Sequence, residues 1–353
     1  MAYIAMKILS VIVPLYNSAK WVEKCLFSIL NQDLPEEKME IICINDGSPD
    51  NSAEIARKIG KEHTSIIVLD QENQGPSGAR NNGMRHASGK YLCFVDPDDY
   101  VEPNVFGDLI AQMENRNLDM LRFDYRIVDE NYAPVEKRDF ERQFDYSACE
   151  MTGADFLANR LDVACNIWRY FYRTEVIVGN NIWCFTGDYF DDTPWLPLVL
   201  MKANRLGVCD TVVYDYQERN GSLVKANSLP RIKRKNEGCM LLIRLMLEEI
   251  KVLNGKEVSY ENMRLLRDIK LTSDLREKIV SWYKMMIAHS VVSLLTSIAV
   301  YEYESRNVVL GELKSLGVFP LSIYKASSKN IQKIRAFNIC PRLMMWLLHI
   351  YNE

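Results

Sequence analysis

The chain has 353 residues, of which 48% are hydrophobic and 25% are charged, as in a globular protein with one large domain and an appended region. Its nine cysteines are odd in number and include no C-x-x-C pair, which argues for a reducing compartment and against disulfides or structural zinc. The presence of only four histidines argues against a histidine-rich metal site.

The net charge of −4 conceals an asymmetry along the chain. Residues 1–229 hold 23 Lys/Arg against 35 Asp/Glu, whereas residues 230–353 hold 20 against 12. The sign change predicts an acidic domain (1–229) followed by a basic helical region (230–353). The basic residues are dispersed and lack the aromatic platforms of a nucleic-acid motif, so nucleic acid is not an expected partner.

Strands and helices alternate through the first hundred residues. The predicted elements are, in chain order, a strand at 10–17, a helix at 21–30, a strand at 40–44, a helix at 53–59 and a strand at 65–69. This order predicts an α/β fold with a mostly parallel sheet and right-handed crossovers. Ligands of such sheets bind at the carboxyl ends of the strands, where Tyr16, Asp46 and Asp96 fall.

An apolar strand at 92–95 runs directly into three carboxylates, Asp96, Asp98 and Asp99. The sequence just after them contains no group that would neutralise them, and such crowding is costly unless a cation or a polar ligand lies among them. The spacing of Asp96 and Asp98 allows one carboxylate to bind a divalent metal while the other holds a sugar hydroxyl. The alternative is a solvated acidic loop in which Asp99 caps the next helix.

Five motifs between residues 8 and 105 resemble those of the inverting glycosyltransferases of family 2, which have the nucleotide-sugar-binding GT-A fold. They are V-I-V-P-L-Y-N at 11–17, C-L-F-S-I-L-N-Q at 25–32, N-D-G-S at 45–48, N-Q-G to A-R-N-N-G at 73–83, and D-P-D-D at 96–99. The resemblance thins beyond residue 105 and is nearly gone after about residue 225. It implies a GT-A domain with a nucleotide-sugar half at about 1–105 and an acceptor half at about 106–229.

The resemblance implies a nucleotide-sugar donor, with a UDP-sugar favoured, bound through Pro14, Tyr16, Asp46, Arg80, Asp96 and Arg219. Tyr16 would stack on the base and Asp46 would accept a ring N–H of uracil, although Asp46 could also cap the following helix. Arg80, in a loop rich in glycine and asparagine, would contact the phosphates or steady the acidic loop. Asp96 would bind the ribose, and Asp98, with Asp96 beside it, would hold Mn²⁺ or Mg²⁺ at the diphosphate.

Inversion by a single displacement requires a base that takes the proton of the acceptor hydroxyl. The segment before an apolar helix at 198–203 resembles the acidic pair of the family, in which the second acid, here Asp192, is the base. Asp191 stands where the family commonly has Glu, which leaves its contribution open, and Asp188 is a third candidate. Asp191 or Asp192 could instead only cap the helix. Arg219 would reach the diphosphate after loop closure, or be an exposed charge beside a plain turn.

Two segments of the basic region are strongly apolar. Met285–Val300 is shorter than a membrane span and is diluted by Ser and Thr, so a helix packed in a core is predicted, with an interfacial or membrane-spanning helix as the alternatives. Cys340–Tyr351 is predicted to be a helix with Pro341 in its first turn, lying flat in a lipid headgroup layer or packed on neighbouring helices. We therefore expect a cytoplasmic protein, peripheral on the inner face of the plasma membrane if this region binds anionic lipid.

Together these patterns predict a metal-dependent inverting glycosyltransferase that uses a glycan or lipid-linked hydroxyl acceptor in bacterial surface polysaccharide synthesis. The alternative is a catalytically silent nucleotide-sugar-binding or scaffold protein, against which the presence of Asp98 and Asp192 argues. A dehydrogenase would need G-x-G-x-x-G after the first strand, where this chain has P-L-Y-N-S. A nucleotidyltransferase would need a glycine-rich basic loop there, which is absent from the sequence.

Overall fold

The computed structural model describes residues 7–135, 150–159, 165–186, 192–218, 228–257, 263, 265–324 and 328–352. The chain divides into two compact units. Unit 1 comprises Met1–Phe156, Cys165–Gly187 and Trp195–Ser222, and unit 2 comprises Leu157–Ala164, Asp188–Pro194 and Leu223–Glu353.

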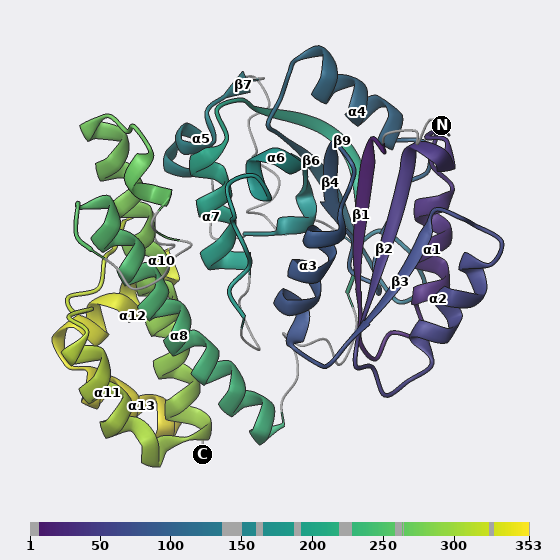
Figure 1. The fold of residues 1–353 in the computed structure, drawn as a ribbon. Coiled ribbons are helices and arrows are strands. Elements are labelled where there is room, and N and C mark those ends of the chain that lie inside the picture. Colours follow the sequence, from purple (N-terminus) through teal and green to yellow (C-terminus); the bar gives the residue numbers. More distant parts are fainter. Residues whose placement is uncertain are drawn as a thin grey trace. The chain divides into compact units, whose positions relative to one another are not determined.

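Within the described residues of unit 1, nine strands form one mixed sheet flanked by helices (Figure 1). The strands are β1 (Leu9–Leu15), β2 (Met39–Asp46), β3 (Ile66–Gln71), β4 (Tyr91–Phe94), β5 (Tyr100–Val101), β6 (Met120–Val128), β7 (Glu150–Met151), β8 (Tyr170–Arg173) and β9 (Leu206–Gln217). Their order in the sheet is β3-β2-β1-β4-β8-β6-β9-β5, with β7 paired to β9. Neighbours from β3 to β4 are parallel, as are β6 and β9, and the other pairs are antiparallel. The predicted α/β fold with a central sheet is therefore confirmed.

The two faces of the parallel half of the sheet bury alternate side chains of each strand. Val11 and Ile41 belong to a core shared with α1 (Val22–Leu30), α2 (Ser52–Gly60) and α4 (Phe106–Asn115). On the other face, Ile42 packs with Ala79 of α3 (Gly75–His86). Gly83 allows α3 to approach this face closely, because a Cβ there would lie only 2.4 Å from the Cγ2 atom of Ile12. The helices predicted at 21–30 and 53–59 correspond to α1 and α2.

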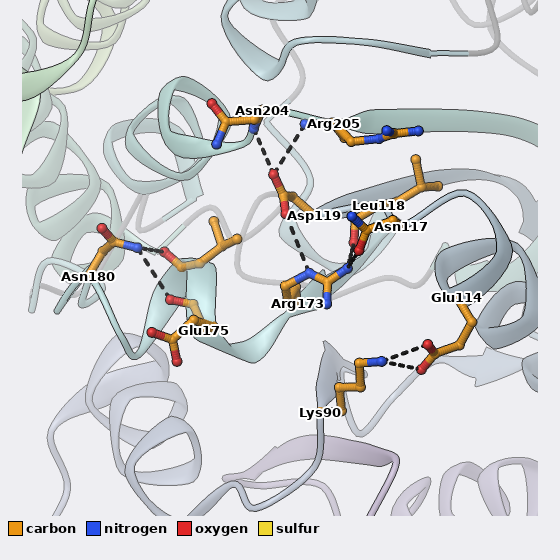
Figure 2. A network of polar contacts seen from close by, with 11 residues as sticks. Lys90, Glu114, Asn117, Leu118, Asp119, Arg173, Glu175, Asn180, Asn204 and Arg205 are labelled. Carbon is orange, nitrogen blue, oxygen red and sulfur yellow. Dashed lines mark hydrogen bonds and ion pairs between the residues drawn. The ribbon is translucent and has the colours of Figure 1, made fainter.

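A polar network joins the beginnings of β6 and β9 to the end of β8 (Figure 2). Arg173 donates hydrogen bonds to the Asn117 side chain at 3.0 Å and to the Leu118 carbonyl at 2.8 Å. Its Nε lies 3.4 Å from Oδ1 of Asp119. The other oxygen of Asp119 accepts the backbone N–H of Asn204 at 2.8 Å, in the turn before β9. This network sets the register of the mixed half of the sheet, which carries part of the site described below.

The structure describes five further helical elements before residue 218. They are η1 (Glu36–Lys38), α5 (Gly153–Asn159), η3 (Ile167–Arg169), α6 (Thr174–Ile177) and α7 (Asp192–Lys202). The apolar helix predicted at 198–203 lies in α7.

The described part of unit 2 is helical (Figure 1). Its elements after residue 228 are α8 (Leu229–Leu253), η4 (Leu265–Asp268), α10 (Ser273–Tyr301), η5 (Tyr303–Ser305), α11 (Arg306–Ser315), α12 (Ser328–Ile339) and α13 (Pro341–Asn352). Helix α10 is long and apolar enough to cross a membrane, but core helices pass the same test, and 61% of its most apolar window is buried. It packs along α8 and α13 within this unit, and Trp282, Ile287 and Leu295 are buried there. The predicted start of the last helix at Pro341 is confirmed.

Candidate active site

The carboxyl ends of β1, β2 and β4 lie at one edge of the sheet, because these strands are adjacent and parallel. Tyr16, just after β1, is 49% exposed, while Asp46 ends β2 and Asp96 follows β4. Pro14 is tolerated inside β1 because pairing with β4 stops at Ile12, so the missing N–H of proline removes no bond of the ladder. Four of the predicted donor-binding residues therefore share this edge.

Asp46 is buried and links β2 to the connection between β3 and α3. Its Oδ1 accepts hydrogen bonds from the Gln71 side chain at 2.7 Å and from the Gln74 backbone N–H at 2.8 Å. No hydrogen bond within the described residues uses Oδ2, so this oxygen can accept an N–H from a ligand. The alternative that Asp46 caps the next helix is wrong, because Asp50 accepts the backbone N–H of Ser52 at the start of α2. Partial burial acts to raise the pKa of Asp50, but hydrogen bonds, first of all from Ser52, lower it to about 2.

Partners distant in sequence hold two of the three acids that follow β4. Arg80 Nη2 lies 2.7 Å from Oδ1 of Asp96. Asp99 is 2% exposed, and its two oxygens accept the Tyr214 hydroxyl and the Gln217 backbone N–H, each at 2.8 Å. The expectation of an uncompensated carboxylate cluster is therefore wrong for Asp96 and Asp99. The alternative of a solvated loop with Asp99 as a helix cap is also wrong, because Asp99 is buried and leads directly into β5.

Of the three acids, Asp96 and Asp98 fit a divalent cation, because Arg80 occupies only Oδ1 of Asp96. Asp99 has a different role, because it is buried inside the loop. Its burial, followed by the charges of Asp98 and Asp96, raises the pKa of Asp99 well above its ordinary value, and Asp99 serves as an internal anchor of the loop. Carboxylate oxygens are the ligands that Mg²⁺ and Mn²⁺ prefer. In the part of the chain that the structure describes, no three His, Cys, Asp or Glu residues form a metal site by themselves. This donor set suits a cation whose remaining ligands come from a bound diphosphate.

An aromatic stack supports the acidic loop from the side of β9. The ring of Trp168 lies parallel to Tyr214 with centroids 4.3 Å apart, and parallel to Tyr216 at 5.8 Å. The Tyr214 hydroxyl also accepts the backbone N–H of Asp96 at 3.0 Å, in addition to its bond to Asp99. Tyr214 therefore ties both ends of the Asp96–Asp99 loop to a rigid support.

Two consecutive residues of α3 hold two different loops. Arg80 lies in α3 and not in a loop as predicted, and its bond to Asp96 agrees with the predicted role of steadying the acidic loop. Asn81, which is 5% exposed, donates to the Cys184 carbonyl at 2.9 Å and accepts the Cys184 N–H at 2.7 Å. In the sequence, Cys184 precedes the predicted catalytic acids Asp188, Asp191 and Asp192.

Sequence reasoning missed the roles of Tyr214 and Asn81. The sequence does place Asn81 directly after Arg80, and it places Tyr214 and Tyr216 on one side of a strand. Neither pattern specifies the partner, so neither role could be read from the sequence.

The predicted base, Asp192, is the first residue of α7 and is half-buried. From Trp195 onward the helix belongs to unit 1. There the Trp195 indole N–H donates to the Ile182 carbonyl at 3.1 Å, and its ring packs edge-on against Phe94. Three further predicted residues lie outside the described residues, namely Asp188, Asp191 and Arg219.

Comparison with known proteins identifies the family. Residues 10–171 match the model of glycosyl transferase family 2. The uncharacterized glycosyltransferase EpsJ of Bacillus subtilis (strain 168) is 34% identical over 220 residues, which cover 62% of this chain and 63% of EpsJ. Residues 10–171 therefore form a domain of glycosyltransferase family 2.

Solved structures confirm the predicted GT-A fold. Residues 1–349 of Staphylococcus aureus TarS superpose with a TM-score of 0.63 at 20% identity, over 95% of this chain and 91% of that one. TarS has also been crystallised with UDP-GlcNAc. The mannosyltransferase PcManGT of Pyrobaculum calidifontis, in complex with GDP-Man and Mn²⁺, has a TM-score of 0.52 at 15% identity, over 98% of this chain and 86% of that one.

Proposed function

We propose that this enzyme transfers a sugar from a nucleotide-sugar, with a UDP-sugar favoured, to a hydroxyl acceptor, with inversion at the transferred carbon. The observation that carries the proposal is that three groups lie at one edge of the sheet. They are the exposed ring of Tyr16, the Oδ2 atom of Asp46, and Asp96, which forms an ion pair with Arg80. An aromatic ring can stack on a base, and a carboxylate accepts the ring N–H of uracil. The TarS complex with UDP-GlcNAc supports the choice of a UDP-sugar, whereas the PcManGT complex shows that a structural neighbour binds GDP-Man.

The residues of the acidic loop would organise the diphosphate end of the donor. Asp96 and Asp98 would hold a divalent cation, which when bound offsets the charge that builds on the leaving diphosphate. Mn²⁺ in the PcManGT complex supports this choice of cofactor. Arg80 keeps Asp96 oriented through its bond to Oδ1, so that Oδ2 is the atom left for a ligand. Arg219 is proposed to reach the diphosphate from the segment after β9.

Asp192 is proposed to take the proton of the acceptor hydroxyl as that oxygen attacks the sugar from the face opposite the diphosphate. Asp191 is the neighbouring candidate. An acid at the first residue of a helix is stabilised in its charged form by the helix dipole, which keeps Asp192 ready to accept a proton.

The acceptor is proposed to be a glycan or lipid-linked carrier of bacterial surface polysaccharide. TarS is named a poly(ribitol-phosphate) beta-N-acetylglucosaminyltransferase and is 28% identical to this chain over 215 residues. Its name supports an acceptor that belongs to a cell-surface polymer, without specifying which one this enzyme uses.

The test is a panel of UDP-, GDP- and dTDP-sugars, measured for thermal stabilisation and hydrolysis with Mn²⁺, with Mg²⁺ and with EDTA. We expect one UDP-sugar to stabilise the protein only when the metal is present. Asp98→Ala should abolish this stabilisation without lowering the melting temperature of the free protein, because it removes one charge from a carboxylate cluster. Metal-independent binding of the donor, or unchanged turnover in the Asp98→Ala enzyme, would refute the proposed cation site.

A further inference from the structure

Helix α13 carries a continuous apolar face that points away from the rest of unit 2. Its large apolar residues Leu343, Trp346, Leu347 and Ile350 are each between 48% and 52% exposed. Their spacing of i, i+3, i+4 and i+7 places all four on one side of a helix. We call these four residues the α13 face.

Contacts on the opposite side of α13 set this orientation. Met345 is fully buried, and α13 packs against α10, α11 and α12. His349 Nδ1 lies 3.1 Å from the carbonyl oxygen of Ala299 in α10, and its ring stacks on Tyr303 at 3.9 Å. The side of α13 that bears Met345 and His349 is thus fastened to the helical unit, so the α13 face is turned outward.

The chain around the α13 face is uniformly basic. Residues 313–352 contain six Lys/Arg and no Asp or Glu. Arg342 is exposed and stands one turn before Trp346, and Arg335 is exposed on α12. Ile339, the last residue of α12, is 85% exposed and adds an apolar side chain to the surface close to the start of α13. An apolar stripe with Trp, bordered by Arg in a segment whose first acid after Glu312 is Glu353, matches a helix that lies in the headgroup layer of an anionic bilayer.

We propose that the α13 face docks on an anionic lipid bilayer surface. Leu343, Trp346, Leu347 and Ile350 enter the boundary between headgroups and acyl chains, while Arg335 and Arg342 contact lipid phosphates. A second copy of the chain is a poorer occupant, because a two-fold interface through this face would bring like charges together. The proposal does not depend on the identity of the sugar donor or of the catalytic base.

Vesicle flotation of the full chain tests the proposal. We expect binding to phosphatidylcholine vesicles that contain phosphatidylglycerol and little binding to phosphatidylcholine alone. Binding should weaken by about tenfold or more when salt shortens the screening length well below the ~10 Å of 0.1 M ionic strength. The triple variant Leu343→Ser/Trp346→Ser/Leu347→Ser should lose binding, and Arg335→Glu/Arg342→Glu should lose the preference for phosphatidylglycerol.

Leu229→Ser is the matched control, because Leu229 is also exposed, at 56%, but lies at the start of α8. It should bind vesicles like the parent chain. Brominated lipids should quench the tryptophan fluorescence of the parent more than that of Trp346→Phe, a variant that retains the apolar face. Equal binding of the triple variant and the parent would overturn the proposal, as would equal binding to neutral and anionic vesicles. A doubled mass in light scattering that Trp346→Ser abolishes would assign the face to a second copy instead.

Discussion

Replacing Tyr214 with Phe tests whether the acidic loop depends on the aromatic stack behind it. The change removes one hydroxyl, which donates to Asp99 at 2.8 Å and accepts the Asp96 N–H at 3.0 Å. It keeps the ring, whose stacking on Trp168 at 4.3 Å does not involve the hydroxyl. The variant therefore separates the tie to the loop from the packing of the stack.

The expected cost follows from two lost hydrogen bonds in a buried setting. A bond to a carboxyl group contributes about 1.5–3 kcal/mol when the acid is charged and about 1 kcal/mol when it is neutral, and the bond to the Asp96 N–H adds about 1 kcal/mol. Because burial raises the pKa of Asp99, the lower figure is appropriate for that bond. We therefore expect a loss of about 2 kcal/mol, which lowers the melting temperature by about 4–8 °C for a unit of this size.

The functional consequence should appear in metal-dependent donor binding, because the freed loop carries Asp96 and Asp98. Donor affinity in the presence of Mn²⁺ should fall by about tenfold, while affinity for the nucleoside without its diphosphate should hold. Tyr216→Phe is the matched control, since Tyr216 stacks on the same Trp168 at 5.8 Å from the same strand. Equal losses for both variants would refute the reasoning, because the effect would then come from the strand or the stack and not from the bonds to the loop.

The other predictions concern the base, its supporting segment and the helical unit. Asp192→Asn should keep donor and metal affinity but lower transfer by about 10²-fold or more, because Asn cannot take a proton; a collapse of donor affinity would show a binding or structural role. Asn81→Ala leaves the N–H and carbonyl of Cys184 without their partner, at about 1–3 kcal/mol each. This variant should lower kcat more than donor affinity, because Cys184 precedes the proposed base Asp192 in the sequence. Equal losses of kcat, from steady-state kinetics, and of donor affinity, from titration, would contradict the idea that Asn81 helps to position Asp192. Glu249 is fully buried in α8, and burial raises its pKa well above the ordinary value of 4.5, while Tyr283 acts in the opposite direction. A folded-state pKa above the unfolded value means that stability falls as pH rises beyond about 4.5. Glu249→Gln should therefore be more stable than the parent near neutral pH, and the difference in their free energies of unfolding should become smaller in acid. Denaturant titrations from neutral to acid pH measure this difference, and a difference that stayed constant or grew in acid would contradict the prediction.

The sequence alone was sufficient for the first elements of the fold and for the grouping of the proposed donor-binding residues at one edge of the sheet. Short, nearly continuous apolar runs define β1 and β2, and helical spacing defines α1 and α2, because these patterns depend only on neighbours in the chain. Boundaries were less accurate: β2 continues through Asn45 and Asp46 because β3 supplies partners at Asp70 and Gln71. The positions of Tyr16, Asp46 and Asp96 at one edge followed from strand order, since parallel strands end together.

Only the tertiary structure decided which groups these residues bind. Tyr214 and Asp99 are 115 residues apart, and Asn81 and Cys184 are 103 apart, so no local period connects them. Their pairing depends on the order and register of β4, β8, β6 and β9, which arise when the sheet is assembled. The same holds for α13: its sequence is apolar on several sides, and packing of Met345 against the other helices selects the side that remains exposed. Local periodicity thus determined the elements, while long-range packing determined the charge partners and the free surface, because those depend on segments that the sequence holds far apart.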